Sequence, residues 1–81
     1  MDAKDKVMSS EIKSKIVLTL KKERGKLSFK DIKDLIGEST DTLKLQLADL
    51  VADGVIKKCK GKYALTELGE EIGELLLKRN Y

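Results

Sequence analysis

Apolar residues recur every three or four positions in four stretches of this 81-residue chain, which is the spacing of amphipathic helices. The pattern predicts helices over residues 10–24, 29–36, 40–53 and 67–79. Residues 1–8 are polar and charged, so we expect a flexible N-terminal segment before a single domain over residues 9–81. The inward-facing stripes are expected to be Ile12, Ile16, Val17 and Leu20; Phe29, Ile32, Leu35 and Ile36; Leu43, Leu47, Leu50 and Val51; and Leu68, Ile72, Leu75 and Leu76.

Capping residues and glycines mark the ends of the predicted helices. Ser28 is a strong N-cap for the second helix, and Asp31 stands where a capping box has its acidic residue. A glycine follows each of the first three helices as a natural stop, at Gly25, Gly37 and Gly54. Because only a short turn separates the second helix from the third, the two predict a helix-turn-helix.

Residues 55–65 predict a β-hairpin between the third and fourth helices. Two short strands flank Lys60-Gly61, and Gly61 supplies the positive φ that a tight hairpin turn needs. Thr66 then begins the last helix. The expected fold class is therefore mainly α with a small β-hairpin (α+β), in the order α-α-α-β-β-α.

Two consecutive segments resemble the winged helix-turn-helix of ArsR- and MarR-type regulators. The first is I-G-E-S-T-D-T-L-K-L-Q-L-A-D-L-V-A-D-G-V-I, and the second is K-G-K-Y-A-L-T-E-L-G. In the second segment, Thr66 and Gly69 stand where these families have a capping Thr and a Gly. The resemblance covers residues 9–79. It implies a transcription regulator whose third helix lies in the major groove of double-stranded DNA and whose hairpin, the wing, contacts the DNA backbone or minor groove.

The resemblance implies two groups of DNA-binding residues. On the outward face of the third helix these are Thr40, Lys44, Leu45 and Gln46, because Gln pairs with adenine, Lys with guanine, and an apolar side chain contacts the thymine methyl. The alternative interpretation is a solvated helix face with ordinary surface lysines. The expected phosphate contacts come from five lysines, which are Lys30, Lys57, Lys58, Lys60 and Lys62.

The net charge of +3 is unevenly distributed along the chain. Residues 55–66 carry four lysines and no acid, whereas residues 34–54 carry one basic and five acidic groups. Asp41, Asp49 and Asp53 in and after the third helix would be repelled by phosphates if they faced DNA. This acidic helix, the short wing and the apolar Leu45 leave a second function open, a winged-helix protein–protein interaction module in a transcription or nucleoprotein assembly.

Composition argues against catalysis and against a membrane location. The chain has no His, a single Cys and no Gly-rich phosphate-binding motif, so we expect no enzymatic activity, no metal and no cofactor. Cys59 is interpreted as an ordinary strand residue rather than a redox sensor. No apolar run approaches the roughly 18 residues of a membrane span, and no apolar signal region follows the N-terminus. We therefore expect a cytoplasmic protein.

Three successive leucines in the last helix exceed what one buried stripe requires. Leu77 or its neighbours Leu75 and Leu76 are therefore expected to face outward and to pair with a second copy of the chain. Such a homodimer would place two reading helices on successive half-sites of DNA, about one turn apart. The alternative is a last helix that packs wholly on its own domain.

Overall fold

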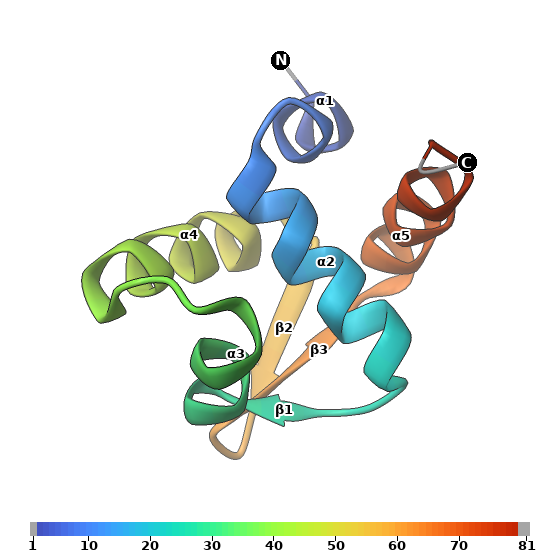
Figure 1. Ribbon diagram of the computed structural model, residues 1–81. Coiled ribbons are helices and arrows are strands. Elements are labelled where there is room, and N and C mark those ends of the chain that lie inside the picture. The colour runs from blue at the N-terminus through green and yellow to red at the C-terminus, as the bar shows by residue number, and fades with distance from the viewer. Residues whose placement is uncertain (1, 80–81) are drawn as a thin grey trace.

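The computed structural model describes residues 2–79 and confirms the predicted fold class, as Figure 1 shows. The sheet lies at one end of the molecule, its hairpin extends away from the helices, and α2 runs through the middle (Figure 1). Residues 80–81 of the predicted domain lie outside the described residues. Within residues 2–79 the elements are α1 (Ala3–Met8), α2 (Glu11–Glu23), β1 (Leu27–Ser28), α3 (Phe29–Ile36), α4 (Thr40–Ala52), β2 (Ile56–Cys59), β3 (Lys62–Leu65) and α5 (Glu67–Arg79).

Serine N-caps determine where the central helices begin. The side chains of Ser10, Ser28 and Ser39 each accept a hydrogen bond from the backbone N–H three residues later, at 3.1 to 3.2 Å. Such a bond satisfies a backbone N–H group that has no partner within the helix. At α3 the predicted capping box is confirmed, because the Asp31 carboxylate accepts a bond from the Ser28 N–H.

Residues with a left-handed backbone conformation mark where the helices end. Gly37 closes α3 at a φ of 81°, and Gly54 follows α4 at a φ of 75°. The predicted stop of α2 at Gly25 differs by one residue, because Arg24 is the C-cap and adopts a left-handed φ of 54°. An L-residue other than Gly rarely adopts this conformation, because its Cβ approaches the neighbouring carbonyl oxygen.

The sheet has three antiparallel strands in the order β1-β3-β2. The predicted hairpin is confirmed, and its turn residues Lys60 and Gly61 have positive φ values of 53° and 78°. Positive φ at both central residues is typical of the type I′ turn, whose twist matches that of the flanking strands. The strand β1 was not predicted; it is only two residues long and exists through its pairing of Leu27 with Tyr63 and Ser28 with Lys62.

The N-terminal segment differs from the flexible segment that the sequence predicts. Its residues 3–8 form α1, whose N-cap is Asp2 and whose Val7 is only 1% exposed. The Ser14 hydroxyl donates a 2.7 Å hydrogen bond to the Val7 carbonyl, and Arg79 donates one of 2.7 Å to the Met8 carbonyl. The α1 helix is therefore held by contacts with α2 and α5, which its own polar sequence could not indicate.

The hydrophobic core lies between the helices and one face of the sheet. Leu35, Val51 and Leu75 were expected in the core, but they are exposed by 55%, 40% and 39%. Each of the three is the member of its predicted stripe that the neighbouring elements leave most exposed. The buried residues are Val7, Ile16, Val17, Leu20, Ile32, Leu43, Leu47, Leu50, Val55, Ile56, Tyr63, Ile72 and Leu76.

The first turn of α5 packs directly on the backbone between α4 and β2. The Thr66 hydroxyl lies within hydrogen-bonding distance of the Gly54 and Val55 carbonyls, and it accepts a 3.2 Å bond from the Gly69 N–H. The Thr66 N–H also donates to the Val55 carbonyl at 3.1 Å. A Cβ atom on Gly69 would stand 2.1 Å from the Val55 carbonyl oxygen. Only glycine therefore permits this approach.

We predict that Gly69→Ala lowers the free energy of unfolding by about 2–3 kcal/mol, because its methyl group would clash with backbone rather than with a movable side chain. Gly73→Ala is the matched control in the same helix. Its Cβ would meet only carbon atoms of the Lys21 side chain, at 3.2 to 3.4 Å. The control should stay within about 1 kcal/mol of the wild type, because alanine also favours the helix. Urea denaturation would measure the free energy of unfolding of both variants. If the two substitutions lowered it equally, the close packing of α5 at Gly69 would be contradicted.

We also predict that Val7→Ala lowers the free energy of unfolding by roughly 1–3 kcal/mol, because it empties a buried site beneath α1. The same change at the exposed Val51 is the control, with an expected effect within about 0.5 kcal/mol. Thermal or urea denaturation of the two variants would compare them. If Val7→Ala were as mild as the control, α1 would not be docked on the core in solution.

Candidate nucleic-acid interface

The outward face of α4 lies opposite its buried stripe. Leu43, Leu47 and Leu50 point into the core, so the other side of the helix faces solvent. Lys44 is exposed there, and Leu45 is 62% exposed, the largest value among the exposed large hydrophobic residues of the described chain. Thr40 is half-buried at the first position of the helix. Two of the four predicted reading residues, Lys44 and Leu45, therefore lie on the accessible side of α4, and Thr40 is only partly accessible at its N-terminal end.

Gln46 is placed less favourably than the sequence predicts. Its side chain is half-buried, and its Oε1 atom is buried without a hydrogen-bond partner among the described residues. The position explains this, because residue 46 lies one helical turn from both Leu43 and Leu50 on the flank of the buried stripe. Gln46 therefore lies at the edge of the outward face and not at its centre.

Two of the three acidic groups near α4 are paired with lysines of other helices. Asp49 lies 3.5 Å from the Lys13 amine of α2, and Asp53 lies 2.8 Å from the Lys6 amine of α1. The hydrogen bond that the Lys6 amine donates to Asp53, together with the attraction between the two charges, raises the pKa of Lys6 above its ordinary value. Repulsion of phosphate by these carboxylates is therefore much smaller than the linear sequence suggests. Asp41 is exposed in the first turn, where a carboxylate favours the positive end of the helix dipole.

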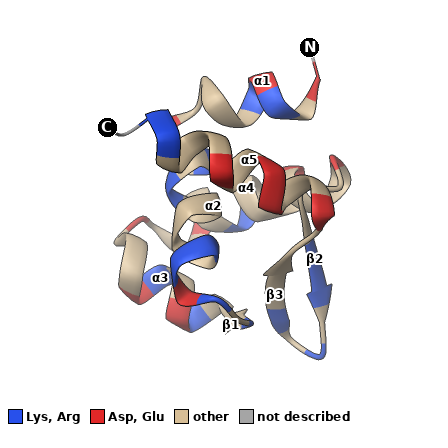
Figure 2. Cartoon of the chain, turned by 90° about the vertical axis from the view of Figure 1, so that its right-hand side faces the viewer, with Lys and Arg blue, Asp and Glu red and all other residues tan. Residues whose placement is uncertain are grey.

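The hairpin lysines divide between the two faces of the sheet. Side chains alternate along a strand, so Lys58 shares a face with its cross-strand partner Tyr63, and its amine lies 5.5 Å from the centre of that ring. Lys57 and Lys62 lie on the opposite face, and Lys60 is at the turn. Figure 2 shows basic residues along both strands and at the turn. The four lysines are all exposed, but they do not form a single surface.

Lys30 lies near the hairpin through β1. It is exposed in the first turn of α3, two residues after Ser28, and Ser28 pairs with Lys62. The sheet thus brings a lysine from α3 close to the second strand of the hairpin, as the predicted set of phosphate contacts requires.

The three leucines of α5 that the sequence suggests for pairing differ in exposure. Leu76 is buried at 3% exposure, Leu77 is half-buried, and only Leu75 is exposed. Successive residues of a helix point about 100° apart, so three neighbours cannot share one face. A contact between two copies through Leu75–Leu77 as one surface is therefore not supported, and Leu75 is the one leucine of the three that remains exposed.

Sequence reasoning did not identify Lys6 and Lys13 as part of this region. Their partners Asp53 and Asp49 are more than thirty residues away in sequence, and Lys6 lies in the segment predicted to be flexible. The pairing depends on how α1 and α2 pack beside α4, so a pattern of local spacing carries no signal for it.

The order of elements, with a helix-turn-helix followed by a hairpin and a capped last helix, is that of a winged-helix regulator domain. A family comparison agrees with this class and specifies it. Residues 4–79 match the family described as "Methanogenesis regulatory protein FilR1, N-terminal domain". The chain therefore belongs to the FilR1 N-terminal domain family, a more specific placement than the ArsR- or MarR-type resemblance. No curated protein and no solved structure matches the chain.

Two further features bear on the class of site. Among residues 2–79, no helix has the length and apolar character needed to cross a lipid bilayer. In the same range, no three His, Cys, Asp or Glu side chains are grouped so that they could hold a metal ion. Cys59 is a free thiol exposed on the hairpin.

Proposed function

We propose that this chain is the DNA-binding domain of a transcription regulator, with α4 in the major groove of double-stranded DNA. The observation that carries the proposal is the electrostatic arrangement of α4. Its outward face presents Lys44 and Leu45, whereas Asp49 and Asp53 are paired with lysines of α1 and α2. Membership of a family of regulatory-protein domains supports the same function.

Base recognition would come from the first two turns of α4. In helix-turn-helix proteins the N-terminal residues of the second helix contact base edges. Lys44 would donate to guanine, Leu45 would contact a thymine methyl, and Thr40 would bond a phosphate or a base at the start of the helix. Gln46 would contribute through its amide nitrogen at the edge of this surface, because its oxygen is buried. We expect modest sequence specificity from so few contacts.

Phosphate contacts would come from Lys30, Lys58 and Lys60. Lys60 lies at the exposed turn, and Lys58 lies on the sheet face that packs on the helices. Lys57 and Lys62 point to the other face of the hairpin and would contribute less. Such contacts release counterions from DNA, so the affinity should fall steeply with salt concentration.

Two copies of the domain would act together on one site. A single small module offers few base contacts, and a two-fold pair would place two α4 helices on successive half-sites. Leu75 on α5 is the exposed apolar residue that would contribute to the pairing. The description of FilR1 as a methanogenesis regulatory protein makes genes of that process the first targets to test. The function proposed is binding without catalysis, in the cytoplasm.

A second function is favoured by the apolar residues that remain exposed. Leu45 on α4 and Leu35 on α3 are 62% and 55% exposed. Such residues suit contact with another protein within a transcription or nucleoprotein assembly. The two functions differ in what α4 touches, so substitutions on α4 distinguish them.

We predict that the domain binds genomic DNA fragments at about 50 mM salt and that binding weakens at least tenfold by about 200 mM. Lys60→Gln should weaken binding to all sequences and reduce the slope of log affinity against log salt by about 1. Leu45→Ala should weaken binding mainly to the preferred sequences, because it removes a base contact. Fluorescence anisotropy titrations would measure these affinities.

The control is Lys78→Gln at the end of α5, which makes the same change of charge away from α4 and the hairpin. It should leave the affinity within about twofold of the wild type. Undetectable DNA binding at the lower salt concentration would overturn the proposed function. If Leu45→Ala and Lys60→Gln left DNA affinity unchanged while DNA still bound, the assigned surface would be wrong.

A further inference from the structure

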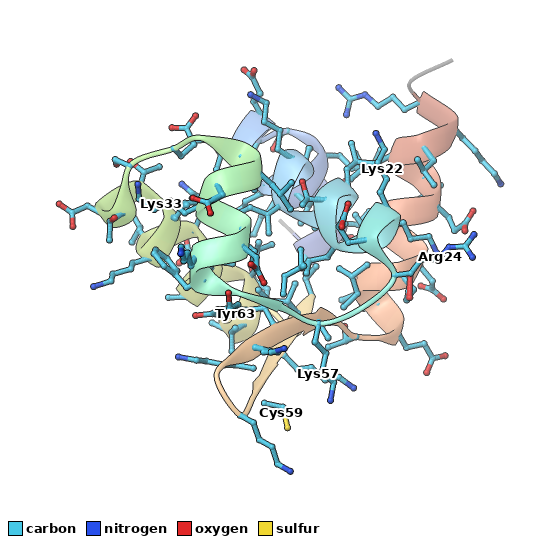
Figure 3. The ribbon with its side chains drawn as sticks, turned by 60° about the horizontal axis from the view of Figure 1, so that its bottom comes forward. Lys22, Arg24, Lys33, Lys57, Cys59 and Tyr63 are labelled. Atoms are coloured by element: carbon cyan, nitrogen blue, oxygen red, sulfur yellow. The ribbon has the colours of Figure 1, made fainter. Side chains whose placement is uncertain are left out.

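A groove of about 820 Å³ lies on the side of the hairpin away from Tyr63. Its walls are the C-terminal end of α2, the turn over residues 24–26, the outer face of the hairpin, and α5. Figure 3 shows Lys22, Arg24 and Lys57 on this side of the molecule, although they come from three different segments. The volume falls within the range of small-molecule sites in proteins, roughly 300–1,000 Å³.

The lining of the groove has five basic and two acidic side chains, which gives it a net charge of +3. Its acidic residues are Glu70 and Glu74, and the Lys21 amine lies 2.9 Å from one and 3.1 Å from the other. The hydrogen bonds that the Lys21 amine donates to these two carboxylates raise the pKa of Lys21, so the charge of Lys21 is engaged in this ion pairing. The four remaining cations of the groove take part in no ion pair among residues 2–79, and they are Lys22, Arg24, Lys26 and Lys57.

Part of the groove is apolar. Leu20, Leu65 and Leu77 line it beside Ala64, and Leu20 belongs to the buried core. Such a surface excludes water from one side of a bound molecule and strengthens its attraction to nearby cations. The combination of aliphatic side chains and a cationic rim is suited to an organic anion, and an inorganic ion would leave the aliphatic side chains unused.

The backbone at Arg24 is a second, independent feature of this groove. Arg24 adopts a left-handed conformation at the C-cap of α2, although Gly25 follows directly and would adopt it without strain. Left-handed conformations of other residues cost of order 1–3 kcal/mol and are found preferentially at ligand sites. This turn ends α2 one residue before the glycine, and Arg24 lines the groove together with Lys22 and Lys26.

We propose that this groove binds a small phosphorylated organic molecule. Its phosphate would be held by Arg24 with Lys22, Lys26 and Lys57, because a guanidinium binds phosphate oxygens with two hydrogen bonds. Its organic portion would lie on Leu20, Ala64, Leu65 and Leu77. No residue of α4 lines the groove, so the site is separate from the proposed reading helix and does not depend on DNA binding. Lys57 belongs to the hairpin, so a bound ligand would contact the wing from its outer face.

The test is an NMR titration of amide signals with two probes of similar charge, inorganic phosphate and phenyl phosphate. Both should shift the signals of residues 22–26, 57 and 64 in a saturable manner. Phenyl phosphate should bind at least about threefold more tightly, because its ring removes apolar surface of the groove from water. Arg24→Gln should weaken the binding of phenyl phosphate by about threefold or more. The matched Lys78→Gln control should not change the affinity.

Three results would overturn the proposal. Equal affinities for the two probes would show that only charge is recognised, and shifts spread over all exposed lysines would show unspecific attraction. Signals of residues 22–26 that respond to a short DNA duplex or an acidic peptide but not to phenyl phosphate would assign the groove to a macromolecule. A parallel DNA titration of Arg24→Gln separates this question from the proposed function, because the variant should keep wild-type affinity for DNA.

Discussion

The close approach of α5 to the start of β2 is the contact on which the rest of the architecture depends. The backbone of Gly54 and Val55 is where α4 ends and the hairpin begins, and Thr66 and Gly69 hold α5 against this same point. The angle between α4 and the hairpin is therefore set where three elements meet. A looser contact here would leave α4 and the hairpin free to move independently, and the surface that they form together would lose its shape.

A second constraint is the distribution of charge between helices. The acidic groups of α4 would make it a poor partner for DNA if they all faced outward, but Lys13 and Lys6 pair with Asp49 and Asp53. The four side chains are partly buried, and ion pairs this close to the surface add at most modestly to stability. For the proposed DNA contact their effect would be larger, because the two lysines offset negative charge beside the surface that would approach phosphates. The short α1 helix therefore contributes to the electrostatics of α4 as well as covering the core at Val7.

The sequence predicted those features that depend on local chemistry. Ser28, Gly37 and the Lys60-Gly61 turn each act within a few residues, so the helix boundaries and the hairpin could be predicted correctly. The features that were missed depend on contacts distant in sequence. The β1 strand exists only through its pairing with β3, and α1 is stabilised by residues of α2 and α5. The exposure of Val51 and the partial burial of Gln46 likewise depend on which neighbours lie beside α4.

The alternation of side chains along the hairpin explains why its lysines do not act as one group. A four-residue strand has only two positions on each face, so adjacent lysines must point in opposite directions. Lys58 lies with Tyr63 on the side of the helices, whereas Lys57 lines the groove beside α5. A linear count of charge over residues 55–66 therefore overstates the cations available to any single partner. The same alternation gives a very short hairpin two electropositive surfaces, one next to the helices and the other facing the turn at Arg24.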